Sequence, residues 1–267
     1  MGPFCVCIVT YYPSPRVIDR LNNIKDKLSL FVYDNTPAKD GELCDISIPK
    51  EMILGDGSNR GLGVALQALL KHSEACGFDR MLYFDQDSFF SNDSLEWIAG
   101  WIECHSLDAE KYSILNFAGN STKKNILHAG IKNMPFVISS GCVFDVVQAL
   151  KIGGHNPRYF LECADYEFCL RVVQAGGQIG EIAGCPDLDH LVEQPIQSVV
   201  ILGNKFNFRL YPRDRSVRFI FNLWNLTWIA LIRGPRNYSY LFLRNSITHI
   251  VSQSRSIALN GFLRIQK

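Results

Sequence analysis

The segment RMLYFDQDSFF, residues 80–90, ends a buried apolar run in two acids one residue apart. A strand that buries its side chains gains nothing from Asp85 and Asp87, because a buried carboxylate costs free energy unless it pairs or binds a cation. Carboxylate oxygens with few other protein ligands suit Mg²⁺ or Mn²⁺. The alternative is a polar turn in which Asp87 or Ser88 caps the next helix.

The chain before this segment alternates between strand and helix patterns. Apolar runs that predict short strands lie at 4–10, 30–34, 51–55 and 80–85. Helical spacing follows the first and third runs, which is typical of an α/β fold with a mostly parallel central sheet flanked by helices. Ligands bind such sheets at the carboxyl ends of the strands. Thr10, Asp34 and Asp85 are therefore expected on one edge.

The second half of the chain is less regular. Further strands are predicted at SILNF (113–117) and FVIS (136–139), and a helix at ADYEFCLRVVQAGG (164–177). After about residue 205, arginines mix with tryptophans and other aromatic residues. We expect one domain over residues 1–205 and a C-terminal helical extension over 206–267.

The bulk composition excludes several classes of protein. The net charge of +1 is unlike that of a nucleic-acid-binding protein. The nine cysteines include no CxxC pair, which disfavours a zinc ribbon and fits buried, reduced thiols in a reducing compartment. The N-terminus lacks a signal-peptide pattern. The longest apolar stretch, FIFNLWNLTWIALI (219–232), has the length of a buried or interfacial helix and not of a membrane span.

Four other features have both a structural and a functional interpretation. Asp165 is either a helix N-cap or a general base facing a cleft. Glu167 and Arg171 have the i,i+4 spacing of a structural ion pair. His190, in DLDHLVE, is either a satisfied surface histidine or a metal ligand. The glycine-rich turn SNRGLG, residues 58–63, offers backbone N–H groups and Arg60 to a phosphate but lacks P-loop spacing.

In order along the chain, these features resemble the family 2 glycosyltransferases of the GT-A fold. They are most similar to the bacterial rhamnosyltransferase-like branch, which builds cell-surface polysaccharides. The matching segments are VTYYP, VYDNT, NRGLGVAL, LYFDQDS, SSGCVFD, GGHNPRYFLECADYEFCLR and DLDH. The resemblance covers roughly residues 4–190 and specifies the fold and superfamily much better than the sugar.

The resemblance implies a role for each matching position. The residues implied to bind the nucleotide-sugar donor are Thr10, Tyr11, Asp34, Asn35, Asn59, Arg60, Gly61, Asp85, Gln86, Ser140 and Gly141. Asp85 would approach the ribose, and Ser140 with Gly141 would border the donor sugar and the acceptor. Asp87 and His190 would hold a Mg²⁺ or Mn²⁺ ion on the diphosphate. Asp165 would be the catalytic base.

The implied activity is an inverting, metal-dependent transfer of a sugar, with dTDP-L-rhamnose as the first choice of donor. The acceptor would be a glycan or a polyprenyl-diphosphate-linked sugar in O-antigen or capsule synthesis. The domain would divide into a nucleotide-sugar half of about residues 1–90 and an acceptor half of about 91–205. One departure is Ala164-Asp165, where many members have Glu-Asp, so acceptor contacts are left open.

Several alternatives stay open at this point. The donor could be a UDP-sugar carrying galactose, galactofuranose or glucose. A nucleotidyltransferase would open with a glycine-rich phosphate-binding segment, and this chain opens with VTYYPSP. A protein that only binds nucleotide sugars is the alternative from another class. We expect a cytoplasmic protein, whose arginine- and aromatic-rich tail either packs on the catalytic domain or contacts the inner face of the cytoplasmic membrane.

Overall fold

The computed structural model describes residues 4–38, 48–119, 130–190, 197–201, 204–208 and 211–265. It divides the chain into two compact units, Met1–Leu191 and Val192–Lys267. The boundary expected after residue 205 falls inside strand β12 (Asn204–Phe208), which pairs with β11 (Gln197–Ile201) in the second unit.

The first unit is built around an eight-stranded sheet with the order β3-β2-β1-β4-β8-β6-β9-β7. Its strands are β1 (Phe4–Thr10), β2 (Leu30–Asp34), β3 (Ile53–Leu54), β4 (Arg80–Asp85), β6 (Ile114–Gly119), β7 (Lys132–Asn133), β8 (Cys142–Asp145) and β9 (Ile179–Cys185). Strands β1, β2, β3 and β4 run parallel to one another, while β8 is antiparallel to both β4 and β6. The predicted α/β fold with a mostly parallel sheet is confirmed.

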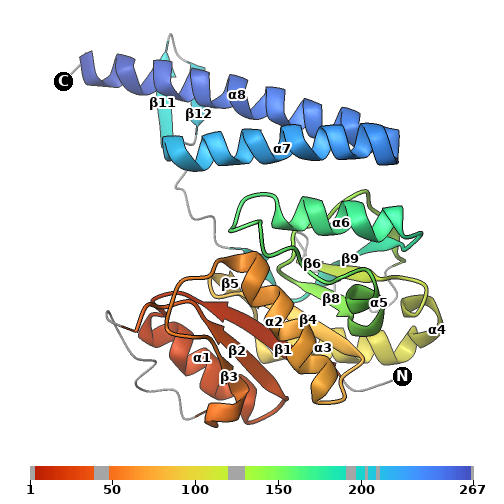
Figure 1. Cartoon of the computed structure of the whole chain (residues 1–267). Helices are drawn as coiled ribbons and strands as arrows, with labels where there is room; N and C mark the ends of the chain where they lie inside the picture. The colour runs from red at the N-terminus through yellow and green to blue at the C-terminus, as the bar shows by residue number, and fades with distance from the viewer. Residues whose placement is uncertain are drawn as a thin grey trace. The chain divides into compact units, whose positions relative to one another are not determined.

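Helices cover both faces of this sheet (Figure 1). The helices of the first unit are α1 (Pro15–Lys25), α2 (Leu62–Ala75), α3 (Asn92–Cys104), α4 (Ser106–Ala109), α5 (Val146–Lys151) and α6 (Ala164–Gln174), with a 3₁₀ turn at Lys50–Met52. One apolar cluster joins the sheet to α1 and α3, and a second joins it to α2, α5 and α6. Because both faces are buried, the strands read as continuous apolar runs.

In strand β1, alternate side chains point to opposite faces of the sheet and belong to different apolar clusters. Val6 and Ile8 pack toward α1 and α3, while Cys5 and Cys7 pack toward α2 and are fully buried. The eight cysteines in the described part of the chain are free thiols, as predicted, and six of them are buried. Cys76 and Cys104 are exposed, so the prediction of burial is wrong for these two.

The strand predicted at FVIS (136–139) is wrong. In the structure the strands of this region are β7 and β8, on either side of that segment. The carbonyls of Val137 and Ile138 bond to side chains: Val137 O accepts from Cys169 Sγ, and Ile138 O accepts from Asn116 Nδ2 and Cys142 Sγ. The Ser139 carbonyl accepts from the Cys142 backbone N–H at 3.0 Å, in the turn that leads into β8. An apolar run of four residues cannot reveal that its hydrogen bonds go to side chains.

The second unit contains the β11–β12 hairpin and two long helices, α7 (Arg213–Arg233) and α8 (Arg236–Ile265), which pack together. Helix α7 contains the predicted FIFNLWNLTWIALI segment. Among the residues that the structure describes, no helix combines the length and apolarity needed to span a bilayer.

A fully enclosed histidine lies beside α6 in the first unit. The imidazole of His155 is 1% exposed, stacks on Phe168 at 4.1 Å between ring centroids, and meets Phe144 edge-on at 5.5 Å. Neither ring nitrogen has a hydrogen-bond partner among the described residues. Burial, aided by the nearby Arg171 charge, lowers the pKa of His155 to about 3.

His155 should make the protein sensitive to mild acid. In the unfolded chain a histidine takes up a proton near pH 6.5, so between pH 6.5 and about 3 the unfolded state binds more protons than the folded state. Folding stability should therefore fall as pH falls through this window, by about 2 kcal/mol at pH 5 from this group. Urea unfolding at pH 7.5 and pH 5 measures the difference, and His155→Phe should remove that part of it.

The control is Phe144→Leu, which loosens the same aromatic cluster without removing a titrating group. It should lower stability at both pH values and keep the loss between them. An unchanged pH dependence in His155→Phe would contradict the assignment.

Candidate active site

The polar residues at the carboxyl ends of β1, β2 and β4 lie together, as predicted. In the sheet register Thr10 is opposite Asp34, and Val9 is opposite Asp85. The hydroxyl of Thr10 donates to Asp34 Oδ1 at 3.1 Å, and the Thr36 backbone N–H donates to the same oxygen at 3.0 Å. The two hydrogen bonds fix the carboxylate of Asp34 at the edge of the sheet.

Gln86 connects the Asp85–Asp87 loop to the end of β1. Its Oε1 accepts from the Tyr11 backbone N–H at 2.8 Å, and its Nε2 donates to the Tyr11 carbonyl at 2.9 Å. The amide of the Gln86 side chain thus bonds to Tyr11 as a second backbone segment would, and it connects two segments that are far apart in the sequence. Gln86, predicted to bind the donor, has a positioning role in the structure. The Tyr11 ring is 45% exposed beside this contact and offers a flat apolar surface.

Asp85 is held from two sides at the end of β4. The Tyr83 hydroxyl donates to Asp85 Oδ1 at 2.5 Å, and the Asp85 backbone N–H donates to Ser140 Oγ at 3.0 Å. Burial, together with the Asp85 charge, raises the pKa of Tyr83 well above its ordinary value, so the phenol stays a hydrogen-bond donor. The hydroxyls of Ser140 and Ser88 also bond to each other.

Ser140 and Gly141, which the resemblance places beside the sugar, are buried beneath the loop. The Gly141 backbone N–H donates to the Tyr83 carbonyl at 2.8 Å. Gly141 has a φ of +79°, and an added Cβ would lie 2.9 Å from the Phe117 carbonyl oxygen, so the turn requires glycine. Both residues therefore support the loop in this structure, and their contact with a sugar stays a prediction.

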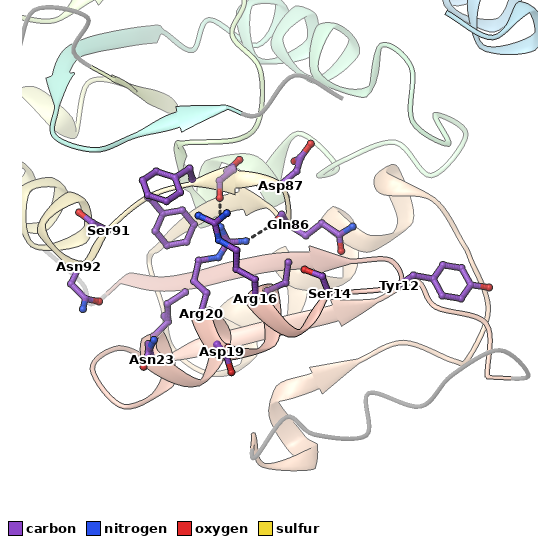
Figure 2. Close-up of a pocket in the computed structure, with 15 residues that line it drawn as sticks. Tyr12, Ser14, Arg16, Asp19, Arg20, Asn23, Gln86, Asp87, Ser91 and Asn92 are labelled. Carbon is purple, nitrogen blue, oxygen red and sulfur yellow. Dashed lines mark hydrogen bonds between the residues drawn. The ribbon is translucent and has the colours of Figure 1, made fainter. Parts of the chain in front are cut away.

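Arg20, which the sequence analysis did not single out, supports the loop from α1. Its guanidinium donates to the carbonyls of Gln86 and Ser88, the two neighbours of Asp87, and lies 5.0 Å from the centroid of the Phe90 ring (Figure 2). Arg20 is spaced three residues after Val17 and four before Ile24, which both belong to the inward face of α1. An arginine on the inward face of a helix is unusual, and this feature of the sequence could have marked Arg20 as a residue with a specific partner.

A cavity of about 680 Å³ lies between α1 and the segment that follows β4 (Figure 2). Tyr12, Arg16, Asp19, Arg20, Asp87 and Phe89 are among its lining residues. Asp87 thus borders open space. The alternative in which Asp87 or Ser88 caps the next helix is wrong, because α3 is capped by Ser91, whose side chain and that of Ser94 form a capping box.

The backbone brings His190 next to the Asp87 loop. Strand β10 (Asp189–His190) pairs antiparallel with β5 (Ser88–Phe89), so that His190 is opposite Ser88, the residue after Asp87. The side chain of His190 lies outside what the structure describes. Within the described residues no three acidic, histidine or cysteine side chains form a metal cluster. A carboxylate with an imidazole fits Mn²⁺, and Mg²⁺ commonly takes one or two protein ligands plus substrate phosphates.

Asp165 lies in the first turn of α6 with its carboxylate beside the same loop. The N-cap of α6 is Cys163, so the N-cap interpretation of Asp165 is wrong. The Ser139 hydroxyl donates to Asp165 Oδ1. Burial raises the pKa of Asp165 above its ordinary value, and the bond from Ser139 opposes that rise. The charges of Asp85, Asp165 and Asp87 all contribute to the raised pKa of Tyr83, and Asp85 also accepts a hydrogen bond from its hydroxyl.

The predicted ion pair in α6 is confirmed and has a structural role. Arg171 Nε lies 2.7 Å from Glu167 Oε1, and Arg171 also donates to the carbonyls of Ile152 and Gly154. Glu167 accepts from Asn156 Nδ2 at 3.2 Å. This network holds the loop before α6 in place.

The glycine-rich turn uses its backbone N–H groups within the protein. Those of Arg60, Gly61, Leu62 and Gly63 donate in turn to Asn35 Oδ1, Asn59 Oδ1, Phe160 O and Tyr159 O. A Cβ added at Gly63 would meet the Asn156 carbonyl oxygen at 2.4 Å, so the turn packs tightly on the loop before α6. The Arg60 side chain is exposed and lies 3.4 Å from the Asp56 carboxylate. In this structure the side chain of Arg60, and not the turn's N–H groups, is therefore the group that a phosphate could meet.

Comparison with known proteins gives one sequence relative and several structural ones. No protein-family model matches the chain. The dTDP-rhamnosyl transferase RfbF of Shigella flexneri is 26% identical over 273 aligned residues, which cover 94% of this chain and 89% of RfbF.

The structural relatives share the fold at low sequence identity. S. aureus TarS superposes with a TM-score of 0.59 at 14% identity over 95% of this chain, which spans 44% of the TarS chain. TarS 1–349 in complex with UDP-GlcNAc has a TM-score of 0.57 at 12% identity and covers 95% of this chain and 74% of that one. GalNAc-T7 with UDP, GalNAc and Mn²⁺ has a TM-score of 0.52 at 11% identity, covering 70% and 44%.

The structural likenesses show the GT-A fold, and the RfbF likeness extends over nearly the whole of both chains. Together with the ordered motifs at the carboxyl edge of the sheet, these likenesses support a family 2 glycosyltransferase of the rhamnosyltransferase type.

Proposed function

We propose that the chain transfers L-rhamnose from dTDP-L-rhamnose, with inversion, to a hydroxyl of a lipid-linked or oligosaccharide acceptor in cell-surface polysaccharide synthesis. The observation that carries the choice of donor is the 26% identity to a dTDP-rhamnosyl transferase over 94% of this chain. The geometry that supports the chemistry is the pair of adjacent serines, of which Ser139 bonds to Asp165 and Ser140 to the backbone of Asp85.

The nucleotide would bind at the carboxyl edge of β1 and β2. The exposed Tyr11 ring would stack on the base, and Asp34, fixed by Thr10, would accept hydrogen bonds from it or from the ribose. Asp85 would face the ribose. Asn35 and Asn59 position the Arg60 turn through their side-chain oxygens, and the Arg60 side chain would meet the diphosphate.

Asp87 and His190 would hold a Mg²⁺ or Mn²⁺ ion, which would supply positive charge to the diphosphate, the leaving group of the transfer. GalNAc-T7, which shares the fold, was solved with UDP and Mn²⁺. Arg20 fixes the backbone on both sides of Asp87, so this carboxylate would be oriented before the donor arrives.

Asp165 would act as general base on the acceptor. Its carboxylate takes the proton of the acceptor hydroxyl while that oxygen bonds to the anomeric carbon and the bond from this carbon to the diphosphate oxygen breaks. A single displacement of this kind inverts the anomeric centre. Ser139 orients the carboxylate, and burial, which raises the pKa of Asp165, makes it a better proton acceptor than an exposed carboxylate.

The donor can be identified by thermal unfolding in the presence of nucleotide sugars. A ligand that binds only the folded state stabilises it by mass action, by about 2.7 kcal/mol at 100 times its Kd. With Mn²⁺ present, dTDP-L-rhamnose should raise Tm more than UDP-galactose, UDP-galactofuranose or UDP-glucose. A larger rise with a UDP-sugar would overturn the rhamnose assignment, and no rise with any of them would favour a protein that is not a transferase.

Asp165→Asn should lower kcat by about 10²- to 10⁴-fold, because the amide cannot accept the proton, while donor binding is retained. Ser139→Ala removes a hydrogen bond that lowers the pKa of Asp165, so the acidic limb of kcat/KM should move to higher pH. Ser139→Thr, which keeps the hydroxyl, is the matched control. The base assignment is wrong if Asp165→Asn transfers sugar at the normal rate.

Arg20→Gln should raise the Mn²⁺ concentration needed for donor binding by about 10- to 100-fold, since groups that orient metal ligands affect metal affinity by this much. Excess Mn²⁺ should restore binding, which a simple folding defect would not allow. Arg16→Gln, one turn earlier on α1, is the control and should behave like the wild type. Asp87→Asn should abolish the Mn²⁺ dependence, and an unaltered Mn²⁺ titration in Arg20→Gln would contradict its positioning role.

A further inference from the structure

Helix α7 presents a row of exposed apolar side chains. Val217, Phe221, Trp224, Trp228 and Ile232 recur every three or four residues and therefore lie along one face of the helix. Phe221 is 71%, Trp228 58% and Ile232 76% exposed. We refer to these five residues as the α7 stripe. The opposite face of α7 carries the buried residues Leu223, Leu226 and Ala230.

Helix α8 carries a second row with the same spacing, formed by Tyr240, Leu243, Ile247 and Ile250, all exposed. We refer to these as the α8 stripe. The indole Nε1 of Trp224 donates to Ser246 Oγ at 3.0 Å, so the α7 stripe meets α8 beside Ile247. This hydrogen bond joins the α7 stripe to α8 at the residue that precedes Ile247 of the α8 stripe. Exposed apolar rows on two packed helices are unusual for a surface that faces only water.

The same helices are strongly cationic. Residues 211–257 contain seven arginines and one aspartate, with no lysine or glutamate, although the whole chain has a net charge of +1. The exposed Arg213 and Arg236 each precede the first residue of a stripe by four positions, and Arg244 lies between Tyr240 and Ile247. Cationic groups thus lie along the edges and ends of the apolar rows.

We propose that the α7 and α8 stripes bind the surface of an anionic lipid bilayer, with both helices lying in the plane of the membrane. Apolar side chains enter the boundary between headgroups and acyl chains, tryptophan suits that boundary, and arginine binds anionic headgroups. A second copy of the chain fits less well, because two faces with the same positive charge repel each other. The inference concerns binding to the membrane and does not depend on the proposed donor.

The first test is co-sedimentation of the full chain with lipid vesicles. The chain should sediment with vesicles that contain phosphatidylglycerol and much less with phosphatidylcholine alone, and salt should weaken the binding because surface charges are screened. Arg236→Gln and Arg244→Gln should each weaken binding about fivefold. Absence of binding to the anionic vesicles overturns the proposal.

The second test removes the apolar rows. The double variant Phe221→Ser, Trp228→Ser should weaken vesicle binding by at least about tenfold. The matched control, Leu107→Ser with Val147→Ser, changes side chains that are 77% and 57% exposed in the first unit and should bind as the wild type does. Donor-induced thermal stabilisation should be equal in all of these proteins, which separates this inference from the proposed function.

Two results in the stripe variant contradict the proposal. Unchanged vesicle binding together with a lower Tm would mean that the stripes pack within the protein. Loss of self-association in sedimentation velocity, with vesicle binding unaltered, would mean that a second copy covers them.

Discussion

Two consecutive serines connect the parts of the site that must act together. The Ser139 hydroxyl donates to Asp165, while the hydroxyl of Ser140 accepts from the Asp85 backbone and bonds to Ser88. Since the two serines are adjacent in one turn, the backbone fixes the distance between the proposed base and the loop that carries Asp87. Reacting groups held in this way need no reorganisation when substrates bind.

The loop after β4 is restrained from further directions. Gln86 bonds to both backbone groups of Tyr11, and Arg20 binds the carbonyls before and after Asp87. These hydrogen bonds therefore act on Gln86 and Ser88, the residues on either side of Asp87. The glycine-rich turn contributes differently, because its N–H groups connect the start of α2 to the loop before α6. Its main effect in this structure is to tie the start of α2 to residues 159 and 160.

The sheet edge was predictable because alternating strands and helices bring the ends of parallel strands together, which places Thr10, Asp34 and Asp85 side by side. The structure also pairs His190 with Ser88, the residue after Asp87, and the resemblance had implied that Asp87 and His190 lie close together. The contact of the Ser139 hydroxyl and the lack of a strand at 136–139 were not predictable, since Ser139 Oγ and the Val137 carbonyl bond to side chains of another element, α6. Arg20 could have been found from its place on the inward face of α1, but its acceptors, two backbone carbonyls, leave no trace in the sequence.

The most direct measurement of this account is a crystal structure with Mn²⁺ and a non-transferable analogue of the dTDP-sugar, with the metal located by its anomalous scattering. We expect a manganese peak within bonding distance of an Asp87 oxygen and a His190 nitrogen. We also expect the Asp165 carboxylate, still bonded to Ser139, on the side of the anomeric carbon opposite the diphosphate. A metal bound without Asp87, or a sugar whose anomeric carbon faces away from Asp165, would contradict it.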